Sequence, residues 1–190
     1  DATTSTIMRD VLIGLTPALI AATIIFGFRA LLLTAVCVAA CVAFEYGTER
    51  ILGRPNTISD LSAAVTGMIL AFNLPVQFPL WMAVVGCFFA IVIVKQLFGG
   101  IGNNFANPAI AARIFLLLSF SQPMTTWLQV QGGKAVQGVY GATPLALISA
   151  GDTANLPSMM EMFLGARGGC MGETCALALI IGGAYLIFRK

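Results

Sequence analysis

The sequence contains no histidine among its 190 residues, and charged residues make up only 9% of it. Histidine is the commonest general base and metal ligand near neutral pH, so its absence argues against a histidine-based hydrolase or zinc enzyme. The formal net charge is only +2, and the positive residues stand singly or in pairs. The chain therefore lacks the basic patch of a nucleic-acid-binding protein, and we expect no nucleic-acid partner.

None of the five cysteines forms a Cys-x-x-Cys pair. An iron–sulfur cluster needs four convergent thiolates, usually from tight spacings. Cys37 and Cys41 stand four residues apart on one expected helix face, where cysteine usually behaves as a small buried hydrophobe. We therefore predict a packing role for the cysteines, with an iron–sulfur site as the weaker alternative.

Hydrophobic residues are what the sequence has in excess, at 58%. They form apolar segments near the length of a membrane-spanning helix, separated by short polar stretches. The sequence thus predicts an all-α fold, a polytopic bundle of membrane helices. The fifth segment is short and contains Arg113, so it either spans by including residues 105–108 or is re-entrant. The six segments are residues 11–26, 30–44, 61–74, 79–98, 109–120 and 173–188.

Glycine and asparagine dominate residues 99–109, GGIGNNFANPA. This composition favours non-helical backbone. Such backbone at membrane depth is tolerated only where it is buried in protein or lines a cavity. Asn103 and Asn104 therefore either line a ligand site or satisfy the hydrogen bonds of their own turn.

The stretch GVYGATPLAL, residues 138–147, stands in the longest region that lacks a membrane-length apolar run. Thr143 follows the small residues Gly141 and Ala142 and precedes Pro144, which pushes it toward an extended backbone. This pattern predicts an exposed hydroxyl on a stiff, sterically open tip. The alternative is a plain helix start, with Thr143 as the N-cap and Pro144 at the first position.

This stretch resembles the flavin-attachment motif of the RnfD/NqrB family, Ser/Thr-Gly-Ala-Thr, whose threonine carries FMN through a phosphoester bond. The family comprises the D subunit of Rnf-type ferredoxin:NAD oxidoreductases and the B subunit of the Na⁺-translocating NADH:quinone reductase. Two positions depart from its pattern: Tyr140 replaces the usual Ser or Thr, and Gln137 stands where Asp is frequent. The resemblance extends over four further blocks in the family's order, DATTSTIMRDVLIGLTPA (1–18), DLSAAVTGMILAFNLP (60–75), GGIGNNFANPA (99–109) and GCMGETCALALIIGG (169–183).

The resemblance implies a ten-helix fold of two inverted five-helix repeats, similar to urea-channel-type folds. Residues 1–190 would be a single transmembrane domain that holds the first repeat and the start of the second. Because the first residue is Asp and family members are longer, we expect the N-terminal part of a larger subunit. Residues 121–172 would form an external, flavin-bearing loop region. The implied cofactor-binding residues are Thr143, Gly141, Ala142, Pro144, Arg113, Asn103 and Asn104.

The implied function is that of an FMN-carrying membrane subunit in a prokaryotic inner membrane, part of a complex that couples ferredoxin:NAD oxidoreduction to Na⁺ or H⁺ transport. The expected partners are the other membrane and peripheral subunits, including a second FMN-bearing subunit and iron–sulfur subunits, together with a flavin transferase and the lipid bilayer. A second, non-covalent flavin such as riboflavin is a further candidate cofactor. Three alternatives stay open: the quinone-reductase B subunit, a passive channel or transporter for a small solute, and a scaffold without flavin.

Charge does not decide which side of the membrane Thr143 faces. With all six segments spanning and the N-terminus inside, six positive residues lie inside and three outside. A re-entrant fifth segment moves Lys134 and Arg167 inside and Arg189 and Lys190 outside, which gives the same ratio. The resemblance implies the external face, where an exported transferase can reach the flavin.

Four charged residues lie in or beside the apolar segments, and three of them have competing interpretations. Arg113 has a flavin-phosphate or ion-path role, or snorkels to the interface. Asp60 and Glu173 are expected to cap helix starts, with a cation site as the alternative because the family's complexes move Na⁺ or H⁺. Lys95 is expected to snorkel at the end of the fourth segment.

Overall fold

Two long helices open the chain in the computed structural model, which describes residues 3–189. Helix α1 spans Thr4–Phe26 and continues through Pro17, and α2 spans Phe28–Ile51. Gly27 separates them with φ of +77°, a conformation that side-chain-bearing residues rarely adopt. Both helices are long and apolar enough to cross a membrane. Lys190, one of the charges counted above, lies outside the described residues.

Shorter apolar helices follow at the expected third to sixth segments. The fourth segment changes from α-helix to π-helix along its length, an irregularity often found at functional sites. These elements are α3 (Ser62–Phe72, after a short 3₁₀ turn η1, Ile58–Asp60), α4 (Leu80–Phe88), the π-helix η2 (Phe89–Gln96), α5 (Pro108–Ser119) and α9 (Ala176–Phe188).

The second apolar segment, expected to end at residue 44, is longer as a helix. Residues 46–51 extend α2, where Glu45 pairs with the buried Lys95 and Glu49 accepts hydrogen bonds from Thr57. Helix α5 begins at Pro108, with Asn107 accepting hydrogen bonds from Ala109 N and Ile110 N. The fifth segment therefore does not lengthen by recruiting residues 105–107.

The expectation of an all-α fold was wrong in one detail, since a two-stranded antiparallel hairpin lies within residues 121–172. Gly132 and Gly133 connect its strands with positive φ values, and a bulge lies between the pairs Leu128↔Tyr140 and Val130↔Ala135. Alternating side chains here suit strands better than a loop. The elements of this region are α6 (Ser121–Met124), β1 (Leu128–Gln131), β2 (Lys134–Tyr140), α7 (Pro144–Ser149) and α8 (Met159–Leu164).

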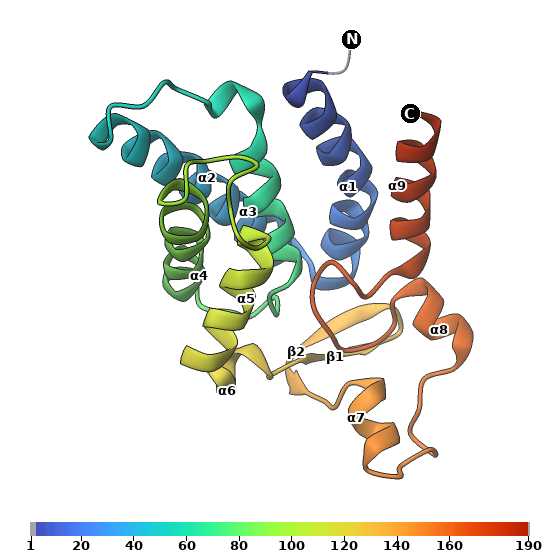
Figure 1. The fold of residues 1–190 in the computed structure, drawn as a ribbon. Coiled ribbons are helices and arrows are strands. Elements are labelled where there is room, and N and C mark those ends of the chain that lie inside the picture. Colours follow the sequence, from blue (N-terminus) through green and yellow to red (C-terminus); the bar gives the residue numbers. More distant parts are fainter. Residues whose placement is uncertain (1–2, 190) are drawn as a thin grey trace.

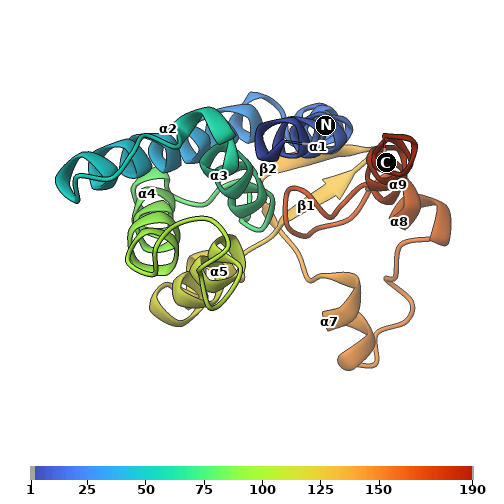
Figure 2. The ribbon, with the colours of Figure 1, turned by 45° about the horizontal axis from the view of Figure 1, so that its top comes forward.

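Most of the segments that connect the helices lie at two opposite ends of the molecule (Figure 1). The N-terminus, the end of α9 and the loop after α2 lie at one end, while the hairpin and α7 lie at the opposite end. Figure 2 shows α2 lying beside α3 and α4, with α1 and α9 neighbouring each other on the other side. Thr143 is therefore at the end of the helices remote from the N-terminus.

Small side chains let the central helices approach closely. A Cβ on Gly67 of α3 would lie 2.7 Å from the backbone oxygen of Cys37 and 2.8 Å from Cα of Val38, so only glycine allows α2 and α3 to pack at this distance. Cys37, Cys41 and Cys87 are fully buried in this core, as the packing role predicts.

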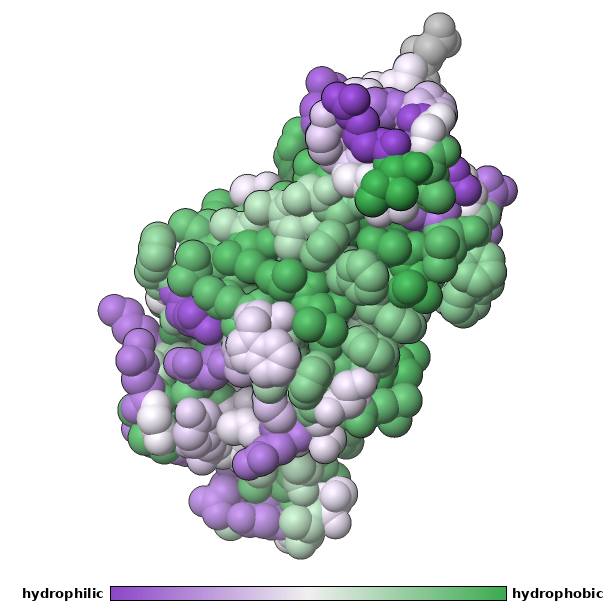
Figure 3. Space-filling view, turned by 90° about the vertical axis from the view of Figure 1, so that its left-hand side faces the viewer, coloured by the Kyte–Doolittle hydropathy of each residue, from purple (hydrophilic) through white to green (hydrophobic). Residues whose placement is uncertain are grey.

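Much of the outer surface is hydrophobic. Figure 3 shows hydrophobic residues over the middle of one face, with hydrophilic residues gathered mainly toward its upper and lower ends. Ile24 on α1 is 65% exposed and Ile180 on α9 is 58% exposed. Exposed apolar surface of this extent marks a membrane or protein interface rather than a water-facing surface.

Candidate flavin-attachment loop and buried polar network

Thr143 is the N-cap of α7, directly after strand β2. Its backbone is extended, with φ of −70° and ψ of 157°, and Pro144 occupies the first helical turn, as the sequence predicts. The hydroxyl Oγ1 accepts one hydrogen bond, from Ala146 N at 3.3 Å. Pro144 is buried and Thr143 is half-buried, so the threonine is less exposed than the sequence predicted. The capping interpretation is confirmed, and it leaves the oxygen available for a further bond.

The two residues before Thr143 form an open approach to it. Gly141 donates from its backbone N to Trp127 O at 3.1 Å, which fixes the strand end to β1. A Cβ at Gly141 would meet only the Gln129 side chain, no closer than 3.5 Å. Ala142 is exposed, and so is Leu145 beyond the cap. The loop is therefore held by backbone contacts and leaves room above the hydroxyl.

Arg113 lies elsewhere, at a junction of three segments. Its Nη1 donates to Asn73 Oδ1 at 2.9 Å, and its Nη2 lies 3.7 Å from Cys170 Sγ. These contacts join α5 to the end of α3 and to the loop before α9. Among the described residues its hydrogen bonds do not reach 141–144, and its side chain is half-buried rather than extended toward the surface. The structure therefore separates Arg113 from the attachment loop.

The glycine–asparagine turn is non-helical, as predicted, with positive φ at three glycines of residues 99–102. Asn104 Nδ2 donates to Ala106 O at 2.7 Å, within its own turn, and Asn103 is exposed. The turn precedes α5 while α7 comes well after it, at the other end of the molecule (Figure 1). Beside the turn lies an apolar groove of about 450 Å³, lined by Phe89, Phe105, Ala106, Asn107, Ile110, Ala111, Ile114, Phe115 and Leu118.

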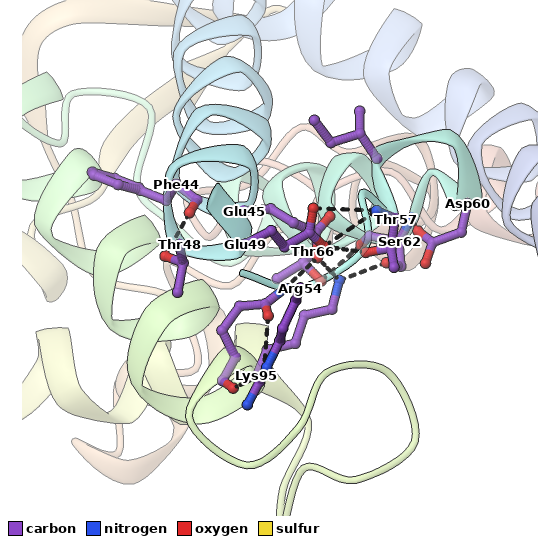
Figure 4. Close-up of polar contacts among 12 residues, drawn as sticks. Phe44, Glu45, Thr48, Glu49, Arg54, Thr57, Asp60, Ser62, Thr66 and Lys95 are labelled. Atoms are coloured by element: carbon purple, nitrogen blue, oxygen red, sulfur yellow. Dashed lines mark hydrogen bonds and ion pairs between the residues drawn. The ribbon is translucent and has the colours of Figure 1, made fainter. Parts of the chain in front are cut away.

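A buried ion pair that the sequence interpretation missed lies between α2 and η2 (Figure 4). Lys95 Nζ donates to Glu45 Oε1 and, at 2.5 Å, to Ser62 Oγ, while Gln96 Nε2 donates to the same carboxylate at 3.0 Å. Lys95 is 3% exposed and Glu45 is fully buried, so the expectation that Lys95 snorkels was wrong. The signal available was a lysine inside the fourth apolar segment and an opposite charge directly after the second, since charges at such places are rare and usually paired.

A second carboxylate continues this network along α2. Glu49 accepts hydrogen bonds from Thr57 N, at 3.2 and 3.3 Å to its two oxygens, and from the Thr57 hydroxyl. Arg54 Nη1 donates to Gln96 O at 2.5 Å. The chain leaving α2 is therefore tied back to the helix and to η2, as Figure 4 shows.

The two predicted capping carboxylates have different outcomes. The N-cap residue of α3 is Leu61, but Asp60 Oδ1 accepts from Ser62 N at 2.7 Å, so its carboxylate binds a free N–H of the helix start as predicted. Glu173 precedes the N-cap of α9, Cys175, and its Oε1 accepts instead from Cys170 N at 3.2 Å. Capping of α9 by Glu173 was therefore wrong, because the helix begins later and the carboxylate holds the preceding loop.

The sequence profile of the NQR2, RnfD, RnfE family matches residues 1–190. The chain belongs to this family. Three family proteins illustrate the similarity. The D subunit of the Na⁺-translocating ferredoxin:NAD⁺ oxidoreductase complex of Acetobacterium woodii is 50% identical over 98% of this chain. The D subunit of the proton-translocating ferredoxin:NAD⁺ oxidoreductase complex of Clostridium ljungdahlii is 37% identical over the whole chain, and the D subunit of the ion-translocating oxidoreductase complex of Stutzerimonas stutzeri is 36% identical over 95%.

The aligned regions cover 58, 60 and 59% of these three relatives. The chain thus spans about three fifths of their length. All three of these family proteins are D subunits of ion-translocating oxidoreductase complexes, two of them acting on ferredoxin and NAD⁺ by name.

Proposed function

We propose that this chain is part of the D subunit of an Rnf-type complex, which couples ferredoxin:NAD oxidoreduction to Na⁺ or H⁺ transport, and that Thr143 carries FMN. The observation that supports the attachment is the geometry of Thr143: a hydroxyl with one weak partner, on extended backbone, anchored by Pro144 and flanked by Gly141 and Ala142. A transferase can reach this oxygen without unfolding the loop.

The residues present fit the attachment chemistry. The Thr143 oxygen would bond to the riboflavin-side phosphorus of the FAD diphosphate. The bond from that phosphorus to the bridging oxygen would break, AMP would leave with that oxygen, and the hydroxyl proton would pass to solvent. Once bound, FMN supplies one- and two-electron redox chemistry, while the protein supplies position and surroundings. Pro144 and the cap to Ala146 hold the attached oxygen at a fixed place relative to the hairpin.

The membrane part of the proposal is a multi-pass bundle in the inner membrane of a prokaryote, the first half of a two-repeat fold. Two long apolar helices, four shorter ones and the exposed hydrophobic surface support it. Buried charge supports ion transport, because ionisable residues inside apolar helices are costly and usually functional. The partners are the remaining subunits of the complex, including iron–sulfur and second FMN-bearing subunits.

The groove beside the glycine–asparagine turn is the place we propose for a second, non-covalent flavin such as riboflavin. Phe89 and Phe115 stack there with ring centroids 4.3 Å apart, and Asn107 supplies a polar group at the rim. An aromatic-lined site with few polar groups suits a flat heterocycle. Asn103 and Asn104 are not among the lining residues, so they would contribute through the shape of the turn.

Covalent flavin on Thr143 is tested by producing the full-length subunit together with an active flavin transferase. The denatured wild-type subunit should fluoresce in a gel under ultraviolet light and carry the added mass of FMN. Thr143→Ala should lose both signals and Thr143→Ser should keep part of them. Ser149→Ala, at the other end of α7, is the matched control and should keep full label. Covalent flavin on Thr143→Ala would place the attachment elsewhere.

A further inference from the structure

A polar pocket of about 310 Å³ lies where α2 ends and the chain turns back toward α3. The residues that line it carry two guanidinium groups, a phenol hydroxyl, an amide and one carboxylate. The lining residues are Tyr46, Glu49, Arg50, Arg54 and Asn56.

Two guanidinium groups against one carboxylate leave the pocket with a positive formal charge, and the carboxylate is already hydrogen-bonded elsewhere. Glu49 is 3% exposed, and its two oxygens accept from the backbone N and hydroxyl of Thr57. Within residues 3–189, neither Arg50 nor Arg54 forms an ion pair with a carboxylate. A pocket with two guanidinium charges and one partnered carboxylate attracts an anion.

Both arginines are held in place yet keep donors to spare. Arg50 donates from Nε and Nη2 to Tyr46 OH at 3.1 and 2.8 Å, and its guanidinium carbon lies 5.3 Å from the centroid of that ring. Arg54 uses Nη1 on Gln96 O and Oε1. A guanidinium carries five N–H groups, and among the described residues Nη1 of Arg50 and Nε and Nη2 of Arg54 have no partner, so they stay available to a ligand. Fixed, forked donors match a phosphate group.

Two exposed apolar residues follow the pocket residue Arg50 in the chain. Ile51 is 86% exposed and Leu52 is 44% exposed, directly after Arg50 in the chain. Tyr46, one turn earlier, has the amphipathic ring that is enriched at membrane interfaces. A free phosphate ion would make no favourable contact with these apolar side chains, whereas a phospholipid places its acyl chains beside its headgroup.

We propose that this pocket binds the phosphate of an anionic phospholipid headgroup, with the acyl chains against Ile51 and Leu52. Basic pockets at helix ends on the cytoplasmic side recognise anionic headgroups in this way. The inference uses the membrane placement proposed above, and is independent of flavin and of electron transfer. It assigns Arg50 and Arg54 a binding role, with Tyr46 orienting Arg50.

The test is native mass spectrometry of the full-length subunit in detergent, titrated with phosphatidylglycerol or with phosphatidylcholine of the same acyl chains. Wild type should bind phosphatidylglycerol preferentially, and Arg50→Gln should weaken that binding about tenfold through loss of a charge-assisted contact. Arg54→Gln should weaken it similarly. Arg50 makes only a local contact with Tyr46, so its variant should keep the wild-type melting temperature and elution volume.

Arg9→Gln is the matched control, since Arg9 is an exposed single arginine on α1, whose start lies at the same end of the molecule. It should bind phosphatidylglycerol as wild type does. Three results would overturn the proposal: full binding by both pocket variants, equal binding of phosphatidylcholine, or displacement of the lipid by millimolar inorganic phosphate, which would indicate a site for the free ion. A subunit that stays monodisperse without detergent would instead refute the membrane placement itself.

Discussion

Lys95 on η2 donates a hydrogen bond to Glu45 on α2, fifty residues away in the chain, and water reaches almost none of either side chain. Ser62 and Gln96 complete the hydrogen bonds of the pair, while Glu45 Oε2 has no partner among the described residues. The pair fixes how the π-helix sits against α2.

Replacing one member of the Glu45–Lys95 pair should lower the unfolding free energy more than replacing both. Glu45→Gln or Lys95→Met alone leaves an uncompensated buried charge, which costs about 3–5 kcal/mol of unfolding free energy. The double variant should be more stable than either single one. Thermal unfolding in detergent, followed by the helical circular dichroism signal, measures the coupling. Arg189→Met is the control, because the Arg189–Asp10 pair has a 48% exposed partner and should contribute about 0–1 kcal/mol. Additive effects of the two single variants would contradict a buried pair.

Gly172 should not tolerate a side chain. Its backbone N donates to Phe72 O at 3.0 Å, and a Cβ there would overlap the Phe72 side chain. Gly172→Ala should therefore destabilise the subunit by about 1–3 kcal/mol through overpacking. Gly183→Ala, in α9 with nothing within 4 Å of its Cβ, should be neutral or slightly stabilising. Equal melting temperatures of the two variants would contradict the close contact between the loop and the end of α3.

The two ends of the molecule should face opposite sides of the membrane. We expect a membrane-impermeant maleimide to label Ala154→Cys in intact cells, because the exposed loop after α7 shares the end that carries Thr143. Pro55→Cys, in the loop after α2, should react only after permeabilisation. The unmodified protein is the control, since four of its five cysteines are buried. The reverse labelling pattern would place Thr143 inside the cell.

The start of α8 should respond to acid. Ser158 N and Oγ donate to Glu161 Oε2, and the backbone hydrogen bond, followed by the hydroxyl, lowers the pKa of the Glu161 carboxyl below its ordinary 4.5. A lowered folded-state pKa gives stability that is present above pH 4.5 and is lost as the pH falls through the folded value. Hydrogen exchange of α8 amides should show Glu161→Gln less protected than wild type at pH 7, with the difference vanishing in acid. The amides of α9 serve as the internal control, and a pH-independent difference would contradict the prediction.

Local features were predictable because they depend on neighbouring residues. Pro144 and the small residues before Thr143 determine the extended, open cap, and Asp60 is close enough in sequence to hold the start of α3. The positions of all six apolar helices were predicted from hydrophobic runs in the sequence. A helix that is buried in protein or contacts lipid needs such a run, whatever its partners are. The family resemblance rested on the same local motifs.

Long-range partners were decided only by the tertiary structure. The residues next to Lys95 do not indicate that Glu45 is its partner, so the sequence favoured a snorkelling lysine. Arg113 likewise finds Asn73 and Cys170 from two other segments. The sequence by itself determined the apolar helices and the geometry of Thr143, because these follow from adjacent side chains. Which buried charges meet followed from the packing of α2 against η2, since burying a charge is tolerated only where the fold brings it a partner.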